Sequence, residues 1–249
     1  MNAEWVVVAG ASKGIGLASA HKLIDLGVSV VVSARNIELL KKEFSGFDDD
    51  KVKIIPWDFS DSSSIQDYSK RVNEIAGKIK GLVYCAGIQM TLPLSMNKPE
   101  QAKKIFEINT FSAMELIRCF SKKSMASDEG ASFVLISSLA AKEGALGKSL
   151  YGASKGALEG FLPSAASELA QRNIRLNIVA PGVIKTDMSS EFLNKMSKEQ
   201  YESLTAAYPL GLGSPEDAAN IIYWLLSDES KWVTGQTFII DGGHIIGKG

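Results

Sequence analysis

The sequence has little of several features that mark specialised classes of protein. Its formal net charge is -1 over 249 residues, so charge gives no reason to expect binding to nucleic acid or to an anionic membrane. Its longest apolar runs, such as W-V-V-V-A-G, end well short of the roughly 20 residues that a membrane span requires. The N-terminus has no basic flank before its apolar stretch, so we expect no signal peptide.

Cysteine and histidine are also scarce. Cys85 and Cys119 are not spaced as C-x-x-C, and no histidine cluster flanks them, so we expect no metal site. Both cysteines fall in apolar segments, which favours buried free thiols. Free thiols suit a reducing compartment, so a cytoplasmic location is expected.

Short β-branched runs alternate with longer segments of helical period. Continuous apolar strands without polar alternation are typical of a parallel sheet covered by helices on both faces. The pattern therefore predicts an α/β, doubly wound Rossmann fold with a seven-stranded sheet, as one domain over residues 1–249. The expected strands are Trp5–Ala9, Val28–Ser33, Val52–Pro56, Gly81–Cys85, Ala131–Ser137, Ile174–Ala180 and Thr237–Ile240.

The segment from about residue 186 to 212 is too long for a simple connection between a strand and a helix. We expect a short helix around Ser190–Leu204 within it. Segments of this kind, at the carboxyl end of a strand, often close over ligands. The segment is therefore interpreted as a substrate lid.

A glycine-rich turn, A-G-A-S-K-G-I-G, follows the first expected strand directly. Glycine at such a turn lets main-chain N–H groups approach a pyrophosphate at the start of the next helix, where the helix dipole favours negative charge. Because the turn lies between a strand and a helix, it favours a dinucleotide site over a purely structural turn. The residues expected at the cofactor are Gly10, Ser12, Lys13, Gly14, Ile15 and Gly16.

The end of the second strand indicates which dinucleotide is bound. An acidic residue there would accept from the ribose hydroxyls of NAD(H), but the strand ends S-A-R-N. Arg35 and Lys13 instead favour the 2′-phosphate of NADP(H). Both could also be solvated surface charges. Asp58, followed by Phe59, could accept from the adenine amino group or cap the following turn.

Three polar residues are expected to converge at the carboxyl edge of the sheet. Ser138 closes the fifth strand, Tyr151 opens the next helix, and Lys155 lies one turn further on the same face. The lysine ammonium is expected to lower the pKa of the phenol from its usual value of about 10. Ser138 would donate to a carbonyl oxygen that gains negative charge. Each could alone be structural, Ser138 as a strand-end hydroxyl and Lys155 as a surface charge.

Only small residues separate this tyrosine from the lysine, namely Gly152, Ala153 and Ser154. We expect them to leave room for a nicotinamide and a substrate against the helix. A tyrosine and a lysine one turn apart would then face both molecules.

Together these motifs resemble the short-chain dehydrogenase/reductase family, in its single-domain branch, over nearly the whole chain. The matching residues are Gly10, Gly14 and Gly16, Asn109 in E-I-N-T, and the set Ser138, Tyr151 and Lys155. The resemblance implies catalytic roles for Asn109, Ser138, Tyr151 and Lys155. It also implies hydride transfer and a homotetramer or homodimer.

The resemblance extends the expected cofactor site to two further turns. Ala86 and Gly87 follow the fourth strand, and Pro181 and Gly182 follow the sixth. The main chain of Ile184 and the hydroxyl of Thr186 are implied to hold the nicotinamide carboxamide. Tyr151 and Lys155 are implied to contact the nicotinamide ribose side as well as the substrate.

The sequence departs from the family pattern at three positions. Cys85 replaces an asparagine and Ala9 replaces a threonine, so we expect an apolar contact between the two strands. Pro163 removes the hydrogen bond to Glu159 within the catalytic helix and is expected to kink it beyond Gly160.

The activity we expect is NADPH-dependent reduction of a ketone, with Tyr151 as the proton donor. The chain most resembles 3-oxoacyl-(acyl-carrier-protein) reductases, which implies a 3-oxoacyl thioester substrate and docking of an acyl carrier protein. Arg172 would favour such docking, but Asp128 and Glu129 would weaken it. A small free ketone, alcohol or sugar is therefore the alternative substrate. The expected apolar pocket lining is Leu139, Ala140, Leu146, Val183, Met188 and Phe192.

A non-catalytic sensor or scaffold is a further alternative, because fold alone does not determine function. Retention of all four catalytic positions argues against it.

Overall fold

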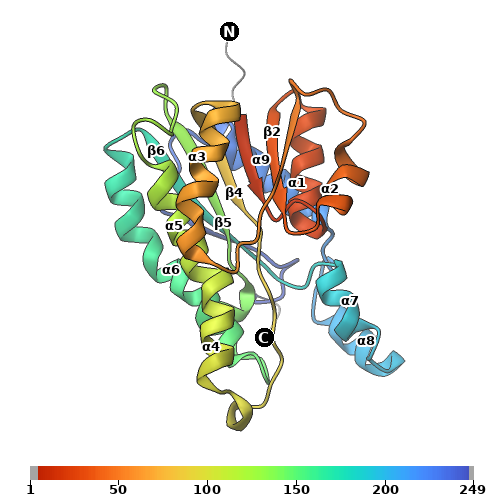
Figure 1. Ribbon diagram of the computed structural model, residues 1–249. Helices are drawn as coiled ribbons and strands as arrows, with labels where there is room; N and C mark the ends of the chain where they lie inside the picture. Colours follow the sequence, from red (N-terminus) through yellow and green to blue (C-terminus); the bar gives the residue numbers. More distant parts are fainter. Residues whose placement is uncertain (1–4, 247–249) are drawn as a thin grey trace.

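A computed structural model describes residues 5–246 of the chain. Seven parallel strands form one sheet in the order β3-β2-β1-β4-β5-β6-β7 (Figure 1). This confirms the predicted doubly wound fold, with strand bounds that differ from the predicted ones by at most two residues. The strands are β1 Trp5–Ala9, β2 Ser29–Ala34, β3 Val52–Pro56, β4 Ile79–Tyr84, β5 Ala131–Ile136, β6 Ile174–Pro181 and β7 Thr237–Ile240.

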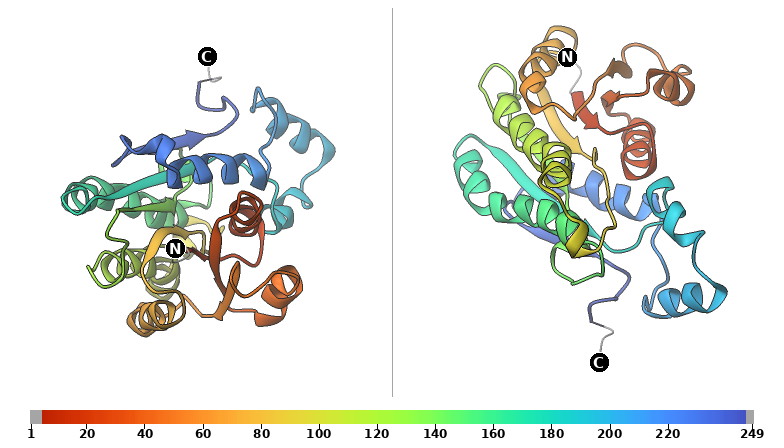
Figure 2. Two further views of the ribbon diagram at one scale, coloured as in Figure 1. Left: turned by 90° about the horizontal axis from the view of Figure 1, so that it is seen from above. Right: turned by 60° about the horizontal axis from the view of Figure 1, so that its bottom comes forward.

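Helices cover both faces of the sheet, as the two views in Figure 2 show. One face packs against α1 Gly14–Asp25, α2 Ile37–Phe44 and α9 Pro215–Leu226. The other packs against α3 Ile65–Ala76, α5 Ser112–Phe120 and α6 Ser149–Ala170.

The apolar strands are explained by these two cores. Along β1, Val6 and Val8 point into one core and Val7 into the other, and all three are buried. Burial of one such side chain stabilises the fold by about 1.5–3 kcal/mol. Because the strands run parallel, the turns that follow them lie at one edge of the sheet, where α1 and α6 begin.

A long, continuous helical segment precedes β5. Helix α4, Pro99–Phe106, runs into the π-helical turn η3, Glu107–Phe111, and then into α5. The short 3₁₀ segments are η1 Ser62–Ser64, η2 Leu94–Met96, η4 Leu139–Ala141 and η5 Asp228–Ser230. The π turn carries Asn109, and π turns inside helices are frequent at functional sites.

The predicted lid contains two helices rather than one. Helix α7 covers Asp187–Leu193 and α8 covers Lys198–Ala206, and both extend away from the sheet in Figure 1. The single predicted helix over Ser190–Leu204 was wrong because Ser197 starts a new helix. Its hydroxyl accepts from the N–H of Gln200, and the Gln200 side chain accepts from the N–H of Ser197.

Helix α6 remains one continuous helix through Pro163. The proline lies two turns beyond Lys155, so the residues at the start of the helix keep regular spacing. Tyr151 and Lys155 therefore lie on one face, at the carboxyl edge of the sheet.

Candidate active site

A cavity of about 900 Å³ runs along the carboxyl edge of the sheet. Ligands of open α/β sheets bind at this edge. The cavity is lined by all the residues predicted at the cofactor and by three of the four predicted catalytic residues. Those that line it are Gly10, Ser12, Lys13, Gly14, Ile15, Gly16, Arg35, Asp58, Phe59, Ala86, Gly87, Ser138, Tyr151, Lys155, Pro181, Gly182, Ile184 and Thr186.

The glycine turn approaches neighbouring backbone too closely for side chains. A Cβ on Gly10, whose φ is +90°, would lie 2.5 Å from the nitrogen of Ala86, and a Cβ on Gly16 would lie 2.2 Å from the Gly10 carbonyl oxygen. Helix α1 begins here with no side-chain cap and no acidic residue in its first turn. Its first N–H groups and its dipole therefore face the cavity, an arrangement that fits a pyrophosphate.

The contact between β1 and β4 beside this turn is apolar. The N–H of Cys85 donates to the Ala9 carbonyl oxygen over 2.8 Å, and burial raises the pKa of the Cys85 thiol to about 12. The thiol is thus neutral near pH 7 and acts as a small apolar group. A Cβ on Gly16 would also lie 3.1 Å from that of Cys85.

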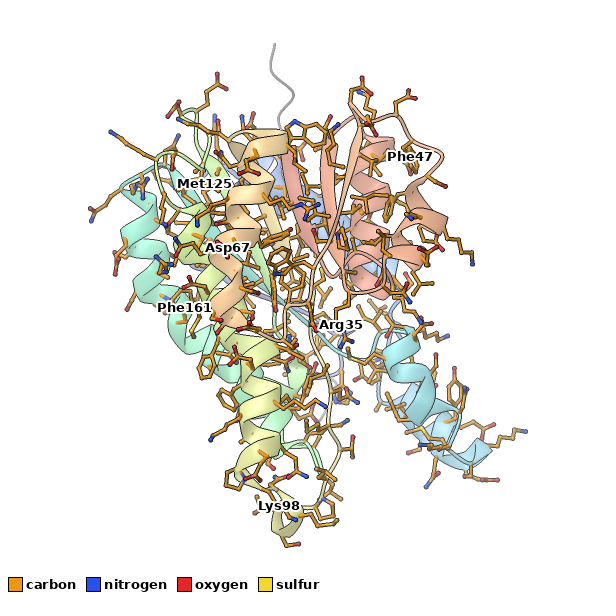
Figure 3. All side chains as sticks on the ribbon, in the orientation of Figure 1. Arg35, Phe47, Asp67, Lys98, Met125 and Phe161 are labelled. Carbon is orange, nitrogen blue, oxygen red and sulfur yellow. The ribbon has the colours of Figure 1, made fainter. Side chains whose placement is uncertain are left out.

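Three charged residues lie at the end of the cavity predicted to hold the adenosine. Arg35 is exposed at the carboxyl edge (Figure 3). Lys13 forms an ion pair of 2.8 Å with Asp187, the first residue of α7. The Asp58 side chain accepts from the N–H of Ser60, whereas Asp61 caps η1. Lys13 thus links the glycine turn to the lid.

Tyr151 lies at the other end of the cavity, buried beside Ser138. Burial raises the pKa of the Tyr151 phenol, and its interaction with the Ser138 side chain lowers it in part. The Ser138 oxygen also accepts from the N–H of Ala140 over 3.2 Å, which holds this hydroxyl at the start of η4. Ser138 and Tyr151 thus form a polar pair at this end of the cavity.

Lys155 does not lower the pKa of Tyr151 as predicted. Its ammonium donates to the Ile136 carbonyl oxygen over 2.8 Å, and burial lowers its own pKa to about 8. A Cβ on Gly87 would lie 3.4 Å from the Lys155 nitrogen, so the ammonium lies beside the turn after β4. The prediction was wrong because sequence spacing places two residues on a face but does not place their side-chain tips.

Asn109 is fully buried, and its side chain holds that same turn. Its oxygen accepts from the N–H of Ile88 over 2.8 Å, and its amide nitrogen donates to the Ile88 carbonyl and to the Ser154 hydroxyl. Both amide hydrogens are therefore in use. The side chain positions the wall of the cavity rather than lining it.

The small residues of α6 bring the helix close to its neighbours and do not make room for ligands. A Cβ on Gly152 would lie 2.5 Å from the Ala140 carbonyl oxygen. Ser154 is fully buried and donates to the Tyr151 carbonyl, while Ala153 is exposed. None of the three lines the cavity. The prediction failed because these three positions lie off the helix face that carries Tyr151 and Lys155 to the cavity.

A charged network that the sequence analysis missed ties α6 to the end of β5. Glu159 accepts from Ser137 over 2.9 Å and pairs with Lys142 over 2.6 Å. Glu159 follows Lys155 by one turn, so helical spacing was the available signal. The network holds the segment that carries Ser138 against the helix that carries Tyr151.

His244 was also missed and joins three segments around the substrate end. Its Nε2 lies 2.9 Å from the Glu143 carboxylate, and its Nδ1 lies 2.8 Å from the Ala207 carbonyl oxygen. Its ring stacks on Tyr208 at 4.4 Å between centroids. Tyr208 in turn accepts from the N–H of Val183. His244 thus brings a segment near the C-terminus to the wall at this end of the cavity.

The substrate end of the cavity is more polar than the apolar lining predicted from the sequence. Leu139, Ala140, Val183, Met188 and Phe192 line the cavity as predicted, but Leu146 is 99% exposed and does not. Leu146 was misplaced because it lies in a loop that turns outward. Polar side chains also line the cavity, among them Gln89, Glu143, Lys148 and His244.

Thr186 lies where the lid begins. Its hydroxyl oxygen accepts from the N–H of Ser189 and so caps α7, which leaves its own hydrogen for a ligand. The carbonyl oxygen of Ile184 accepts from the Ser189 hydroxyl over 2.7 Å. Among residues 5–246, no group of three or more metal-ligating side chains is found.

Comparison with known proteins agrees with this arrangement. The sequence model of a family described as "Enoyl-(Acyl carrier protein) reductase" matches residues 10–244. A protein of Xenopus laevis, "Carbonyl reductase family member 4", is 36% identical over 237 residues, which are 95% of each chain. The chain belongs to the short-chain dehydrogenase/reductase family. It is thus an oxidoreductase by family.

Other members of this family show the same likeness. The "3-oxoacyl-[acyl-carrier-protein] reductase FabG" of Thermotoga maritima is 34% identical over 247 residues, with 96% of this chain and 97% of the relative covered. A short-chain dehydrogenase/reductase from Mycobacterium ulcerans has a TM-score of 0.89 at 28% identity, covering 98% of this chain and 90% of its own. "ElxO with NADP Bound" has a TM-score of 0.86 at 26% identity, covering 98% and 99%.

Proposed function

We propose that this chain is an NADPH-dependent reductase that transfers a hydride to a ketone, with Tyr151 as the proton donor. The observation that carries the proposal is that the Tyr151 and Ser138 pair and the glycine turn line one cavity. A cavity that joins a phosphate-binding turn to a phenol and a hydroxyl fits a dinucleotide and a carbonyl compound side by side.

The chain's own residues would hold NADP(H) along this cavity. The start of α1 would bind the pyrophosphate, and Arg35 and Lys13 would bind the 2′-phosphate once Lys13 leaves Asp187. Thr186 and the main chain of Ile184 would hold the carboxamide. A solved relative with bound NADP supports this choice of dinucleotide.

When bound, the nicotinamide supplies a hydride to the carbonyl carbon. Ser138 donates a hydrogen bond to the carbonyl oxygen, which gains negative charge as the hydride arrives. Tyr151 transfers its phenolic proton to that oxygen, and the product is an alcohol. Because burial raises the pKa of the Tyr151 phenol, it keeps its proton at neutral pH, and the protonated form that can donate is the one present.

Lys155 then returns a proton to the phenolate left on Tyr151. Its ammonium lies in the same wall of the cavity, and its pKa of about 8 allows it to give up a proton near neutral pH. A proton reaching Tyr151 from this side restores the donor for the next turnover. Asn109 keeps the adjoining turn in place through Ile88.

The substrate that the relatives favour is a 3-oxoacyl thioester, since several are named 3-oxoacyl-[acyl-carrier-protein] reductases. Docking of an acyl carrier protein belongs to this proposal. The charged residues that the sequence analysis weighed for docking do not lie near the cavity. Asp128 and Glu129 precede β5 and Arg172 precedes β6, so all three lie at the amino edge of the sheet, away from the cavity. Asp128 and Glu129 also pair with Lys78 and Lys80.

A small free ketone is the second candidate substrate. It is favoured by the polar side chains at the substrate end of the cavity, because a long acyl chain would be better matched by an apolar wall. A cytoplasmic location and a homotetramer or homodimer are part of the proposal. Within residues 5–246, no helix is both long enough and apolar enough to span a membrane.

The test is an NADPH oxidation assay with acetoacetyl thioester as its carrier-protein conjugate and as its coenzyme A ester, beside simple ketones and sugars. Preference for the conjugate would support the carrier-bound substrate, and preference for free ketones would support the second candidate. Binding of NADPH with no oxidation by any ketone would indicate a non-catalytic sensor or scaffold.

A further inference from the structure

The substrate end of the cavity carries an ammonium group that the proposed mechanism does not use. Lys148 lies immediately before α6 and lines the cavity. It precedes Tyr151 by three residues, so the two side chains leave neighbouring positions of one helical turn. The cavity thus lets a substrate whose carbonyl contacts Tyr151 place another of its groups near Lys148.

Neighbouring elements hold this ammonium in place. Its nitrogen donates to the Thr91 hydroxyl over 2.6 Å and lies 6.0 Å from the centroid of the Phe192 ring, on lid helix α7. The loops that carry Thr91 and Lys148 are tied by a bond from the Leu92 N–H to the Gly147 carbonyl oxygen. These contacts place the Lys148 ammonium between the lid and the wall of the cavity.

The Lys148 ammonium forms no ion pair with the side chains that the structure describes. The nearest acidic residue along the chain, Glu143, pairs with His244. Burial lowers the pKa of Lys148, since a half-buried ammonium is less well solvated than one in water. An anion delivered by the substrate would compensate for that lost solvation.

A second polar group lines the same cavity. Gln89, in the turn after β4, offers amide hydrogens that a carboxylate can accept. The carboxylate has two oxygens, so it suits one ammonium and one amide together. Lys148 and Gln89 therefore match an anionic substrate group better than the apolar chain of a fatty acyl thioester, while Glu143, which lines the same cavity, is paired with His244.

We propose that Lys148 binds the carboxylate of the substrate, so that the ketone reduced by this chain is an oxo acid whose carboxylate lies a few bonds from the reacting carbonyl. This inference rests on the proposed ketone reduction and narrows its substrate class. Lys148 is then a residue that determines specificity, and it takes no part in hydride or proton transfer.

The test compares each acid with its neutral ester, which keeps the carbonyl in the same place. Pyruvate, acetoacetate and levulinate are assayed with NADPH beside their methyl esters, for the parent chain, Lys148→Met and Lys148→Arg. In at least one pair the parent should favour the acid. For that pair, the acid-to-ester ratio of kcat/KM should fall at least tenfold in Lys148→Met. Lys148→Arg should keep most of the ratio, because it keeps the charge.

Two outcomes overturn the inference: the parent favours the ester in all three pairs, or Lys148→Met leaves the ratio unchanged. Reduction of simple ketones would survive either result, so the proposed function would stand. If no ketone is reduced at all, calorimetry decides instead. The three acids are titrated into NADPH-loaded Tyr151→Phe and into the same variant with Lys148→Met. Tighter binding of an acid by the first chain supports the carboxylate site, and equal or absent binding refutes it.

Discussion

Because the Lys155 ammonium is buried, we expect the stability of the folded chain to depend on pH, which can be measured without a substrate. The pKa of Lys155 in the folded chain is about 8, against 10.5 for the free side chain. Below pH 8 both states bind the proton, and the folded chain carries the full cost of burying the charge. Between pH 8 and 10.5 the folded lysine is neutral while the unfolded one still binds its proton. The free energy of unfolding contributed by this residue therefore rises with pH across that window.

The magnitude follows from the same two values. At about 1.4 kcal/mol per pH unit, burial of the charge costs about 3 kcal/mol at pH 7 and about 1 kcal/mol at pH 10. Lys155→Met removes this cost and also removes the hydrogen bond to Ile136, which is worth about 1 kcal/mol. The variant should thus be more stable than the parent by about 2 kcal/mol at pH 7 and equally stable at pH 10.

Urea unfolding followed by circular dichroism at pH 7, 8, 9 and 10 measures this difference. The parent and the variant share every other titrating group, so the difference isolates Lys155. A difference that does not change between pH 7 and 10, or a variant that is less stable at pH 7, would refute the description of Lys155 as a buried, destabilised ammonium.

Three further predictions concern the cofactor end of the cavity. Arg35→Ala should weaken NADPH binding at least tenfold and leave NADH binding within twofold, as measured by nucleotide fluorescence, and equal loss for both would contradict the 2′-phosphate assignment. Asp187→Asn removes the ion pair that holds Lys13 and should tighten NADPH binding up to about fivefold, since an exposed ion pair is worth up to about 1 kcal/mol. Unchanged NADPH binding would show that Asp187 does not compete with the 2′-phosphate for Lys13. Gly16→Ala should abolish nucleotide binding, because its Cβ would lie 2.2 Å from the Gly10 carbonyl oxygen, and normal binding would rule out this close approach.

The parts of the fold that repeat a simple pattern were predictable from the sequence. Apolar runs such as Trp5–Ala9 are buried on both faces, and this requirement is visible as a lack of polar alternation. The glycine turn was predictable for a related reason, since Gly10 and Gly16 have no space for a side chain. Burial on both faces and a close backbone approach each require particular residue types, so both can be predicted from the sequence.

Contacts between distant segments could not be predicted from local sequence patterns. Lys148, Gln89 and His244 line the substrate end, yet each comes from a different loop or terminus, and nothing local indicates that they meet. The same holds for Lys155, whose face on α6 was predicted but whose ammonium contacts Ile136, a residue of β5. Side-chain direction depends on the packing of both elements, so spacing along one helix does not determine it.

The central claim is that the phenolic proton of Tyr151 is the one delivered to the carbonyl oxygen. It is tested most directly by Tyr151→Phe, which removes only the hydroxyl. Single-turnover hydride transfer to a ketone that the parent reduces, with NADPH affinity measured in parallel, should show a rate lower by about 10²–10⁴-fold and an affinity within twofold of the parent. Hydride transfer at the parent rate in the phenylalanine variant would contradict the account.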